Sequence, residues 1–301
     1  PQKTKVHYSI ETNATLLTND VIEELYKNHI GIGISIDGDR KCHDLQRTFV
    51  SGKGSYDTVK KNLLQAQRYY KNKIGTITTI TKQTAVHIEK IIEHLVLDLH
   101  ISNIKLNFVH ASTYTHGQNQ CLNTQEIADT ELRILYKIIE LQERGYDVME
   151  HNIFIKLKNL LFREYADICL SCGCCGGEKM IVFDMDGNIY PCELTDDASF
   201  VIGSIYKKES LIEQIKMTID KDKAFFKMKK AVECEKCYWK FFCRGGCTVR
   251  ALSEKRQMEV IDIDHIECAI NQVLYPALME LVLRKPHIVN QMLGEDLLVD
   301  E

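Results

Sequence analysis

Apolar residues in the first 110 positions alternate between short β-branched runs and longer stretches with helical periodicity. The short runs predict strands at residues 6–10, 30–36, 74–81 and 104–109. The longer stretches predict helices at residues 19–29, 56–72 and 84–99, the first of them capped by Thr18 or Asn19. Strands that alternate with helices usually pair in parallel, so this region is predicted to be an α/β domain with a parallel sheet. Four such units are too few to close an eight-stranded barrel, so the sheet is either open or lacks its first strands.

The pattern changes after residue 110. Helical stretches with apolar stripes are predicted at residues 124–143 and 153–165, and again at 211–230 and 269–295. Between them, residues 179–183 and 188–190 flank Asp186-Gly187 and predict a hairpin that places Cys192 just past its second strand. We therefore divide the chain into a sheet domain, a helical connection, a cysteine-rich domain and a helical tail, at residues 1–125, 126–168, 169–275 and 276–301.

Length and charge restrict the class of protein. The 301 residues are enough for two domains with separate cores. A net charge of −4 provides no basic field, which disfavours a nucleic-acid partner. We find no apolar run long enough to span a membrane and no secretory signal, and expect a cytoplasmic protein. Because residue 1 is Pro and a strand-like run follows at once, we expect the sequence to be the C-terminal part of a longer chain.

The cysteines carry the clearest chemical signal. Ten of the 12 fall between residues 169 and 268, and four of these form the run Cys234-x2-Cys237-x5-Cys243-x3-Cys247. Thiolates at such density suit a soft metal better than core packing, and a disulfide framework belongs to smaller secreted domains. Zinc ribbons favour two Cys-x2-Cys knuckles, so the spacing favours iron-sulfur clusters, with structural zinc as the alternative. Cys42 and Cys121 stand apart and are expected to be ordinary thiols.

The cysteine pattern resembles a known family. Gly187-x4-Cys192, the four-cysteine run and Cys268 resemble the SPASM domain of radical S-adenosylmethionine (SAM) enzymes of the sulfatase-maturase and peptide-maturase group. Upstream, residues 9–17 (SIETNATLL) resemble the third barrel strand of that group. Residues 33–38 (GISIDG), with the loop up to residue 57, resemble its fourth strand and the segment that follows. The resemblance covers about residues 6–268 and implies a partial (βα)6-type radical SAM barrel followed by a small iron-sulfur domain.

One family feature is absent from the sequence. The Cys-x3-Cys-x2-Cys loop that holds the SAM-cleaving cluster appears nowhere in these residues. In the family this loop follows the first barrel strand, and the matching region here begins at the third. We expect the loop to lie in a preceding part of the protein, so this fragment alone should not cleave SAM.

The resemblance also implies a division of the cysteines between two auxiliary [4Fe-4S] clusters. Cys192, Cys247 and Cys268 would join one upstream cysteine at the first cluster. Cys234, Cys237 and Cys243 would join another at the second. Cys169 and Cys175 are the preferred upstream pair, with Cys172 and Cys174 as alternatives.

Cofactor and substrate residues follow from the same resemblance. Reacting groups in such barrels lie at the C-terminal strand ends, where this chain has Thr12, Asn13, Ser35 and Asp37. Ser35 would hold the methionyl carboxylate of SAM together with a loop cation, Arg47 or, alternatively, Lys53. Asp37-Gly38 is otherwise simply a turn.

Glu193, directly after Cys192, occupies the position where sulfatase maturases have an acid proposed to accept the substrate proton. This chain has Glu where that pattern has Asp, and a solvated charge is the alternative.

The resemblance therefore implies a radical SAM maturase with two auxiliary clusters. A 5′-deoxyadenosyl radical would abstract hydrogen from a peptide or protein substrate, and a flavodoxin or ferredoxin would supply electrons. Thioether cross-linking of a ribosomal peptide is the first expectation and formylglycine formation in a sulfatase the second. A non-catalytic iron-sulfur or zinc module is the alternative from a different class.

Overall fold

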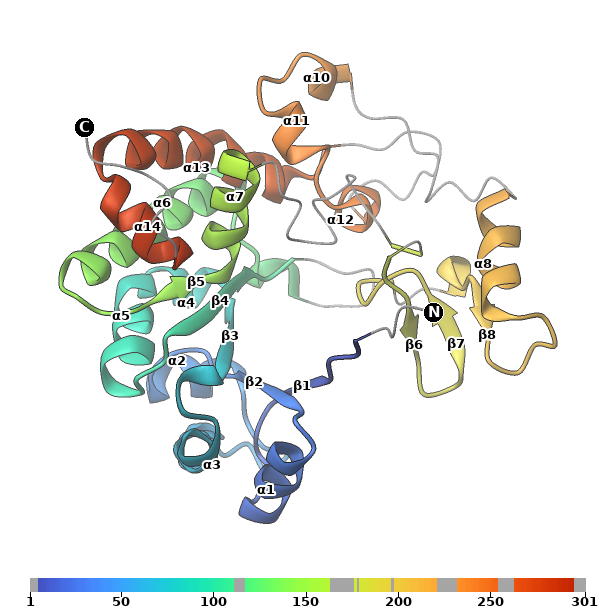
Figure 1. Cartoon of the computed structure of the whole chain (residues 1–301), viewed down its shortest axis with the longest axis horizontal. Helices are drawn as coiled ribbons and strands as arrows, with labels where there is room; N and C mark the ends of the chain where they lie inside the picture. Colours follow the sequence, from blue (N-terminus) through green and yellow to red (C-terminus); the bar gives the residue numbers. More distant parts are fainter. Residues whose placement is uncertain are drawn as a thin grey trace. The chain divides into compact units, whose positions relative to one another are not determined.

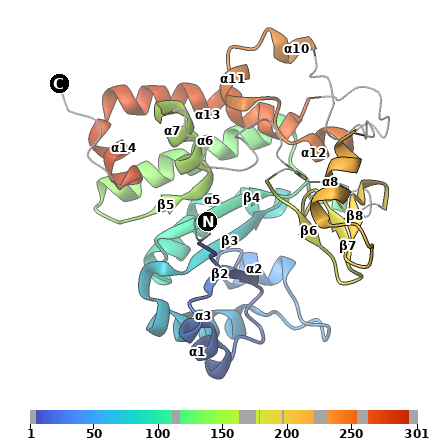
Figure 2. The ribbon, with the colours of Figure 1, turned by 45° about the vertical axis from the view of Figure 1, so that its right-hand side comes forward.

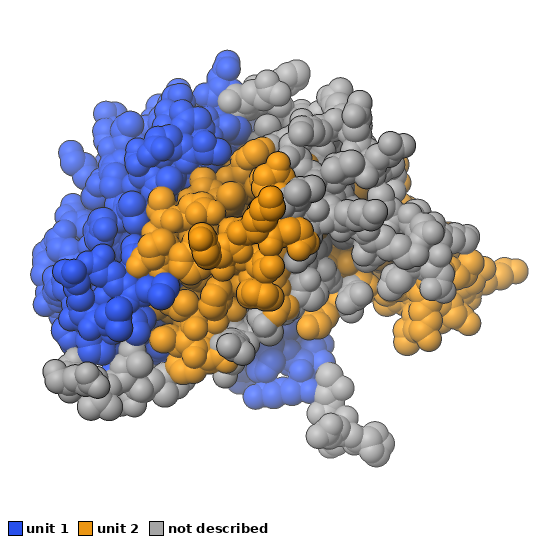
Figure 3. All heavy atoms as spheres, turned by 90° about the horizontal axis from the view of Figure 1, so that it is seen from above, with its two compact units in different colours: residues 1–109, 116–154, 277–301 blue, residues 110–115, 155–276 orange. Residues whose placement is uncertain are grey.

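The structure is a computed structural model that describes residues 5–110, 117–162, 176–177, 179–195, 198–220, 232–253 and 263–294. The chain forms two compact units, coloured separately in Figure 3. The first comprises Pro1–Val109, His116–Phe154 and Ala277–Glu301, and the second comprises His110–Thr115 and Ile155–Pro276.

The first unit contains a five-stranded sheet in which every neighbouring pair is parallel, in the order β1-β2-β3-β4-β5 (Figure 1). Its strands are β1 (Ser9–Thr12), β2 (Gly31–Ser35), β3 (Gly75–Ile80), β4 (Asn103–Phe108) and β5 (Met149–Glu150). Because buried and partly exposed residues alternate along β2, β3 and the first part of β4, one face of these strands faces the core. The predicted parallel α/β architecture is confirmed.

Helices follow the strands of this sheet. They are α1 (Asn19–Lys27), α2 (Arg40–Gln46), α3 (Tyr56–Tyr70), α4 (Lys82–Ala85), α5 (Ile88–Glu93), α6 (Thr124–Glu143) and α14 (Pro286–Leu293). Short 3₁₀ helices are η1 (Lys71–Lys73) and η3 (Gly117–Gln120), and η2 (His94–Asp98) is a π-helix that directly continues α5. The α1 cap is Thr18, whose hydroxyl accepts from the N–H of Val21, as predicted.

Three differences from the sequence prediction have local causes. The helix predicted at residues 84–99 is interrupted, because Thr81 and Thr84 form a capping box for α4 and a new helix begins only at Ile88. The first strand begins at Ser9 rather than at residue 6, because its pairing with β2 starts only at Ser9, opposite Gly31. The two-residue strand β5 and the short helix α2 carry too little apolar periodicity for the sequence to indicate them.

The second unit contains a three-stranded antiparallel sheet, ordered β6-β7-β8, with strands β6 (Val182–Phe183), β7 (Asn188–Tyr190) and β8 (Gly203–Ser204) (Figure 2). The predicted hairpin is confirmed. Asp184 fixes its turn, since Oδ1 accepts from the N–H groups of Asp186 (2.9 Å) and Asn188 (2.8 Å). Gly187 has φ +77°, which a residue with a side chain rarely adopts.

The remaining helices are α7 (His151–Phe162), α8 (Leu211–Asp220), α10 (Val232–Glu235), α11 (Lys240–Cys243), α12 (Thr248–Ser253) and α13 (His265–Arg284). The helix predicted at residues 211–230 is present as far as Asp220, and residues 221–231 lie outside the described part.

Helix α13 is the one described helix long and apolar enough, by length and composition, to cross a membrane, contrary to the sequence expectation of no such run. A core helix passes the same test, and α13 buries Leu274, Tyr275 and Leu278. These three side chains belong to the core, whereas Leu283 on the same helix is 81% exposed.

Glu150 connects three elements of the first unit. Its carboxylate is 3% exposed, and it accepts from the N–H groups of Leu106 in β4 (3.0 Å) and Ile153 in α7 (2.8 Å). Burial raises the pKa of Glu150 to about 7, although these backbone donors act to lower it. Nothing in the pattern of apolar and polar positions indicated this buried carboxyl group.

Glu150 should make stability depend on pH. The folded pKa of about 7 lies above the ordinary value of 4.5, so protonated Glu150 stabilises the fold fully below 4.5 and loses this contribution as pH rises to 7. Between about pH 5 and pH 8, the free energy of unfolding of the parent protein should fall by about 2 kcal/mol relative to Glu150→Gln. Urea unfolding across this range measures the difference. A difference that stays constant with pH would contradict the assignment.

Candidate functional site

The carboxyl edge of the parallel sheet brings together the predicted SAM-facing residues of two strands. Thr12 ends β1 and Ser35 ends β2, and Thr12 pairs with Ile34, the neighbour of Ser35. Asn13 and Asp37 follow these ends. Ligands of parallel α/β sheets bind at this edge, so the position fits the prediction. Their contact with SAM remains a prediction.

Asp37 is the most heavily bonded of these residues. Its side chain is 1% exposed and accepts from Arg47 Nε (2.6 Å) and from the N–H of Thr79 (2.9 Å). Arg47 Nη2 donates to the other carboxylate oxygen at 3.3 Å. Asp37 thus acts as the ion-pair partner of Arg47, and a SAM carboxylate bound by Arg47 would have to share the guanidinium with it.

Buried His43 completes this cluster. Its Nδ1 accepts from the N–H of Asp37 (3.2 Å), so its Nε2 carries the proton and donates to Ser55 Oγ (3.0 Å). Ser55 Oγ in turn donates to the carbonyl of Arg47 (3.0 Å). Burial lowers the pKa of His43, which agrees with a neutral ring. His43 therefore supports the loop that carries Arg47.

Thr12 and Asn13 form a compact turn. Thr12 Oγ1 accepts from the N–H of Ala14 (3.0 Å), and Asn13 Oδ1 accepts from the N–H (3.1 Å) and hydroxyl (2.9 Å) of Thr15. Ala14 has φ +56°, and its carbonyl accepts from Asn62 Nδ2 (2.7 Å). The turn is therefore held in one conformation at the sheet edge.

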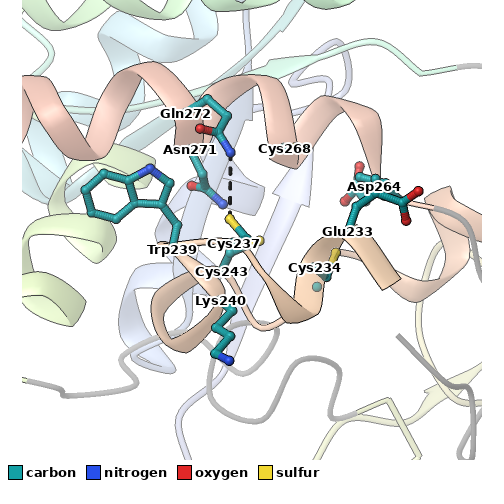
Figure 4. A pocket seen from close by; sticks show the side chains of 12 residues that line it. Glu233, Cys234, Cys237, Trp239, Lys240, Cys243, Asp264, Cys268, Asn271 and Gln272 are labelled. Atoms are coloured by element: carbon teal, nitrogen blue, oxygen red, sulfur yellow. Dashed lines mark hydrogen bonds between the residues drawn. The ribbon is translucent and has the colours of Figure 1, made fainter. Parts of the chain in front are cut away.

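In the second unit, four cysteines line one cavity of about 130 Å³. Its lining includes Cys234 of α10, Cys237, Cys243 of α11 and Cys268 of α13. Figure 4 shows Asn271 and Gln272 on the same side of α13, and Gln272 Nε2 donates to Cys237 Sγ at 3.7 Å. Burial, and then the Cys237 charge, raise the pKa of the Cys268 thiol. Cys268 and Cys237 are therefore electrostatic neighbours.

This grouping differs from the predicted division of the cysteines. Cys268 lines the pocket with Cys234, Cys237 and Cys243, whereas Cys192 and Cys247 do not. The reason is the direction of α13, which places Cys268 one turn before Asn271 and Gln272 on the pocket side. Consecutive spacing could not show this, because Cys268 follows Cys247 only after residues 248–267.

The thiols around this cavity are soft donors. Every cysteine in the described part of the chain is free of disulfide bonds. Among the described residues, no three Cys, His, Asp or Glu side chains gather closely enough to hold one metal ion. Four thiols around one cavity fit the donor set of an iron-sulfur cluster.

The loop between Cys243 and Cys247 packs tightly against the start of α13. Arg244, Gly245 and Gly246 all have positive φ, at +54°, +94° and +72°. A Cβ added to Gly246 would lie 2.8 Å from Cβ of Asp264. The N–H of Cys247 donates to Asp264 Oδ2 at 2.7 Å. The Gly245-Gly246 pair was the sequence signal for this close approach, which the cysteine spacing alone did not reveal.

The other predicted site residues lie elsewhere. Cys192 follows the hairpin and is 6% exposed, and its carbonyl accepts from Thr195 Oγ1 (2.5 Å). Glu193 is exposed. Cys169 and Cys175, with the alternatives Cys172 and Cys174, lie outside the described residues.

Comparison with known proteins identifies relatives. No protein-family profile matches the chain. It is 27% identical over 245 residues to the cysteine-type anaerobic sulfatase-maturating enzyme of Clostridium novyi (strain NT), covering 80% of this chain and 64% of that protein. It is 24% identical over 254 residues to the serine-type anaerobic sulfatase-maturating enzyme of Bacteroides thetaiotaomicron, covering 79% and 60%. The chain thus spans less than two thirds of the length of these relatives.

Solved structures show the same fold. Native anSMEcpe with bound AdoMet and Kp18Cys peptide has a TM-score of 0.79 at 20% identity, covering 93% of this chain and 76% of that one. Streptococcus suis SuiB bound to precursor peptide SuiA has a TM-score of 0.57 at 17% identity, covering 86% and 58%. The chain shares the fold of these two structures. The homologues are anaerobic sulfatase-maturating enzymes, which confirms the resemblance drawn from the sequence motifs.

Gly246→Ala should separate the cysteine loop from α13. Positive φ and the contact with Asp264 together should cost about 2–4 kcal/mol. Gly294→Ala is the control, because Gly294 also has positive φ but a Cβ there meets nothing within 4 Å. The control should lose about 1 kcal/mol. Denaturant unfolding of both variants measures the difference, and equal losses would show that the close approach contributes nothing.

Proposed function

We propose that this chain belongs to a radical SAM maturase that modifies a peptide or protein side chain. In this proposal the sheet edge at Thr12, Asn13, Ser35 and Asp37 contacts SAM, and the cysteine-rich unit binds auxiliary iron-sulfur clusters. The observation that carries the proposal is the pocket lined by Cys234, Cys237, Cys243 and Cys268. The similarity to anaerobic sulfatase-maturating enzymes over about four fifths of the chain supports it.

The chemistry of this pocket follows from its donors. A [4Fe-4S] cluster bound there would supply a site that accepts and returns one electron. Cys234, Cys237, Cys243 and Cys268 would hold it, Gln272 would donate to the Cys237 sulfur, and Trp239 would exclude water. Trp239 stacks on Tyr275 at 5.3 Å between ring centroids, which keeps this wall of the pocket apolar. Cys192 and Cys247 would contribute to a second cluster with two of the upstream cysteines.

Two reactions fit the proposal. Native anSMEcpe was solved with a Kp18Cys peptide and SuiB with its precursor peptide SuiA, which supports a peptide substrate. The curated relatives, both cysteine-type and serine-type, favour oxidation of a Cys or Ser side chain to formylglycine. Thioether cross-linking is the other candidate. Mass spectrometry of a treated cysteine peptide separates them, because formylglycine formation removes the sulfur and cross-linking retains it. A flavodoxin or ferredoxin would donate the electrons.

The pocket grouping makes a prediction about iron content. Cys237→Ala and Cys268→Ala should each remove the same cluster, so the double variant should lose no more iron and sulfide than either single variant. Under the division predicted from the sequence, the two substitutions would strike different clusters and their losses would add. Cys121→Ser, at a thiol of the first unit, is the control and should keep full content. Anaerobic reconstitution with iron, sulfide and zinc determination decides between these results. Zinc without sulfide in the parent protein would leave only the structural metal-binding alternative.

Glu193 provides a test of catalysis. Its exposed carboxylate follows Cys192, where it could accept a substrate proton. In the complete enzyme, Glu193→Gln should lower turnover by roughly 100-fold while leaving the iron content unchanged, since a positioned general base contributes about that much. Glu209→Gln, at another exposed glutamate, is the control and should be fully active. An unchanged rate in Glu193→Gln would identify Glu193 as a solvated charge.

A further inference from the structure

Buried ionic side chains connect the helices α7, α12 and α13 in the cysteine-rich unit. Lys156 on α7 has a side chain that is 5% exposed, and its Nζ donates to Glu267 Oε1 at 2.5 Å. It also donates to Asn271 Oδ1 at 2.6 Å. Arg250 on α12 donates to Asp264 Oδ2 (2.7 Å) and to Glu267 Oε2 (3.3 Å). Glu267 therefore accepts from two cations on two different helices.

These charges lie beside the cysteines. Glu267 directly precedes Cys268, Asn271 lines the cysteine pocket, and Arg250 is in the first turn of the helix that follows Cys247. Lys156 reaches the pocket through its hydrogen bond to Asn271, which is one of the lining residues. A buried cation and a buried carboxylate therefore adjoin the same pocket.

We propose that Lys156 and Glu267 form an opposed charge pair that sets the electron affinity of the pocket lined by Cys234, Cys237, Cys243 and Cys268. This inference rests on the proposed function, because it requires an iron-sulfur cluster in that pocket. When such a cluster takes up one electron, the pocket gains one negative charge. A buried cation nearby favours that charge and a buried carboxylate opposes it, and both act strongly where water is excluded.

A purely structural role for the pair would predict something different. If Lys156 only neutralised Glu267 and held α7 against α13, its removal would lower stability or iron content without a defined effect on potential. An electrostatic role requires shifts of opposite sign for the two partners. It also requires that removing both charges together restores the potential, because the net charge of the pair is then unchanged.

The test is a redox titration of the reconstituted complete protein, with dithionite as the electron donor and the reduced cluster followed by electron paramagnetic resonance. Lys156→Met should shift the midpoint potential of the pocket cluster downward, and Glu267→Gln should shift it upward. The double variant should titrate close to the parent protein. Lys156→Arg, which keeps the charge, should also remain close to the parent. Lys158→Met, which removes a positive charge from the same helix, is the matched control and should show no shift.

The iron and sulfide content of the parent protein distinguishes failure of the proposed function from failure of this inference alone. A parent protein that binds no cluster would defeat the proposed function and this inference with it. Full cluster content with unshifted potentials in both single variants would overturn the inference alone. If Lys156→Met fails to retain its cluster, the nearly isosteric Glu267→Gln decides the question. A raised potential in that variant supports the electrostatic pair, and an unchanged one overturns it.

Discussion

The cysteine site depends on the carboxylate of Asp264 more than on any other single group. This side chain is buried and accepts from the N–H of Cys247, from the N–H of Glu267 and from the guanidinium of Arg250. A buried carboxylate is tolerated only when its oxygens are satisfied in this way. Because its donors come from the cysteine loop, from α12 and from the first turn of α13, the carboxylate fixes all three relative to one another. The position of Cys268 beside Cys237 and Cys243 follows from that constraint.

In the first unit, a buried carboxylate likewise holds a loop in place at the edge of the sheet. Asp37 is buried just after β2, and it accepts from the Arg47 guanidinium and from the N–H of Thr79 at the end of β3. His43 and Ser55 support the same loop from behind. The loop that the resemblance assigns to SAM binding is therefore held in place by internal bonds. The charge of the Arg47 guanidinium is already balanced by Asp37. Ser35 and the turn after β1 supply uncharged polar groups at the same edge.

Two kinds of constraint thus meet in the proposed enzyme. The parallel sheet offers a rigid edge with polar groups from neighbouring strands, as ligand sites of α/β folds require. The cysteine-rich unit offers thiols whose surroundings contain both a buried cation and a buried carboxylate. In iron-sulfur proteins, net charge and hydrogen bonds around the sulfurs set the reduction potential. If a cluster binds in the pocket as proposed, the ionic network of α7, α12 and α13 would therefore act on its chemistry as well as on the folding of the unit.

Much of this protein could be predicted from its sequence. Apolar periodicity located α1, α3 and α6 and the strands β2, β3 and β4, because these elements bury one face and their residues repeat accordingly. The Asp186-Gly187 turn indicated the hairpin, and the cysteine density indicated the metal chemistry and the family. These features are local, since each depends on residues only a few positions apart.

The tertiary structure decided which residues lie together. Cys268 joins the pocket through the direction of α13, Lys156 and Glu267 meet across more than one hundred positions, and Glu150 is buried by β4 and α7. Spacing along the chain carries no information about such pairs. Their partners are chosen by how helices pack and by the need of every buried charge to find a donor or acceptor. The sequence by itself therefore determined the fold class and indicated the kind of chemistry, and only packing determined which cysteines and charges lie together.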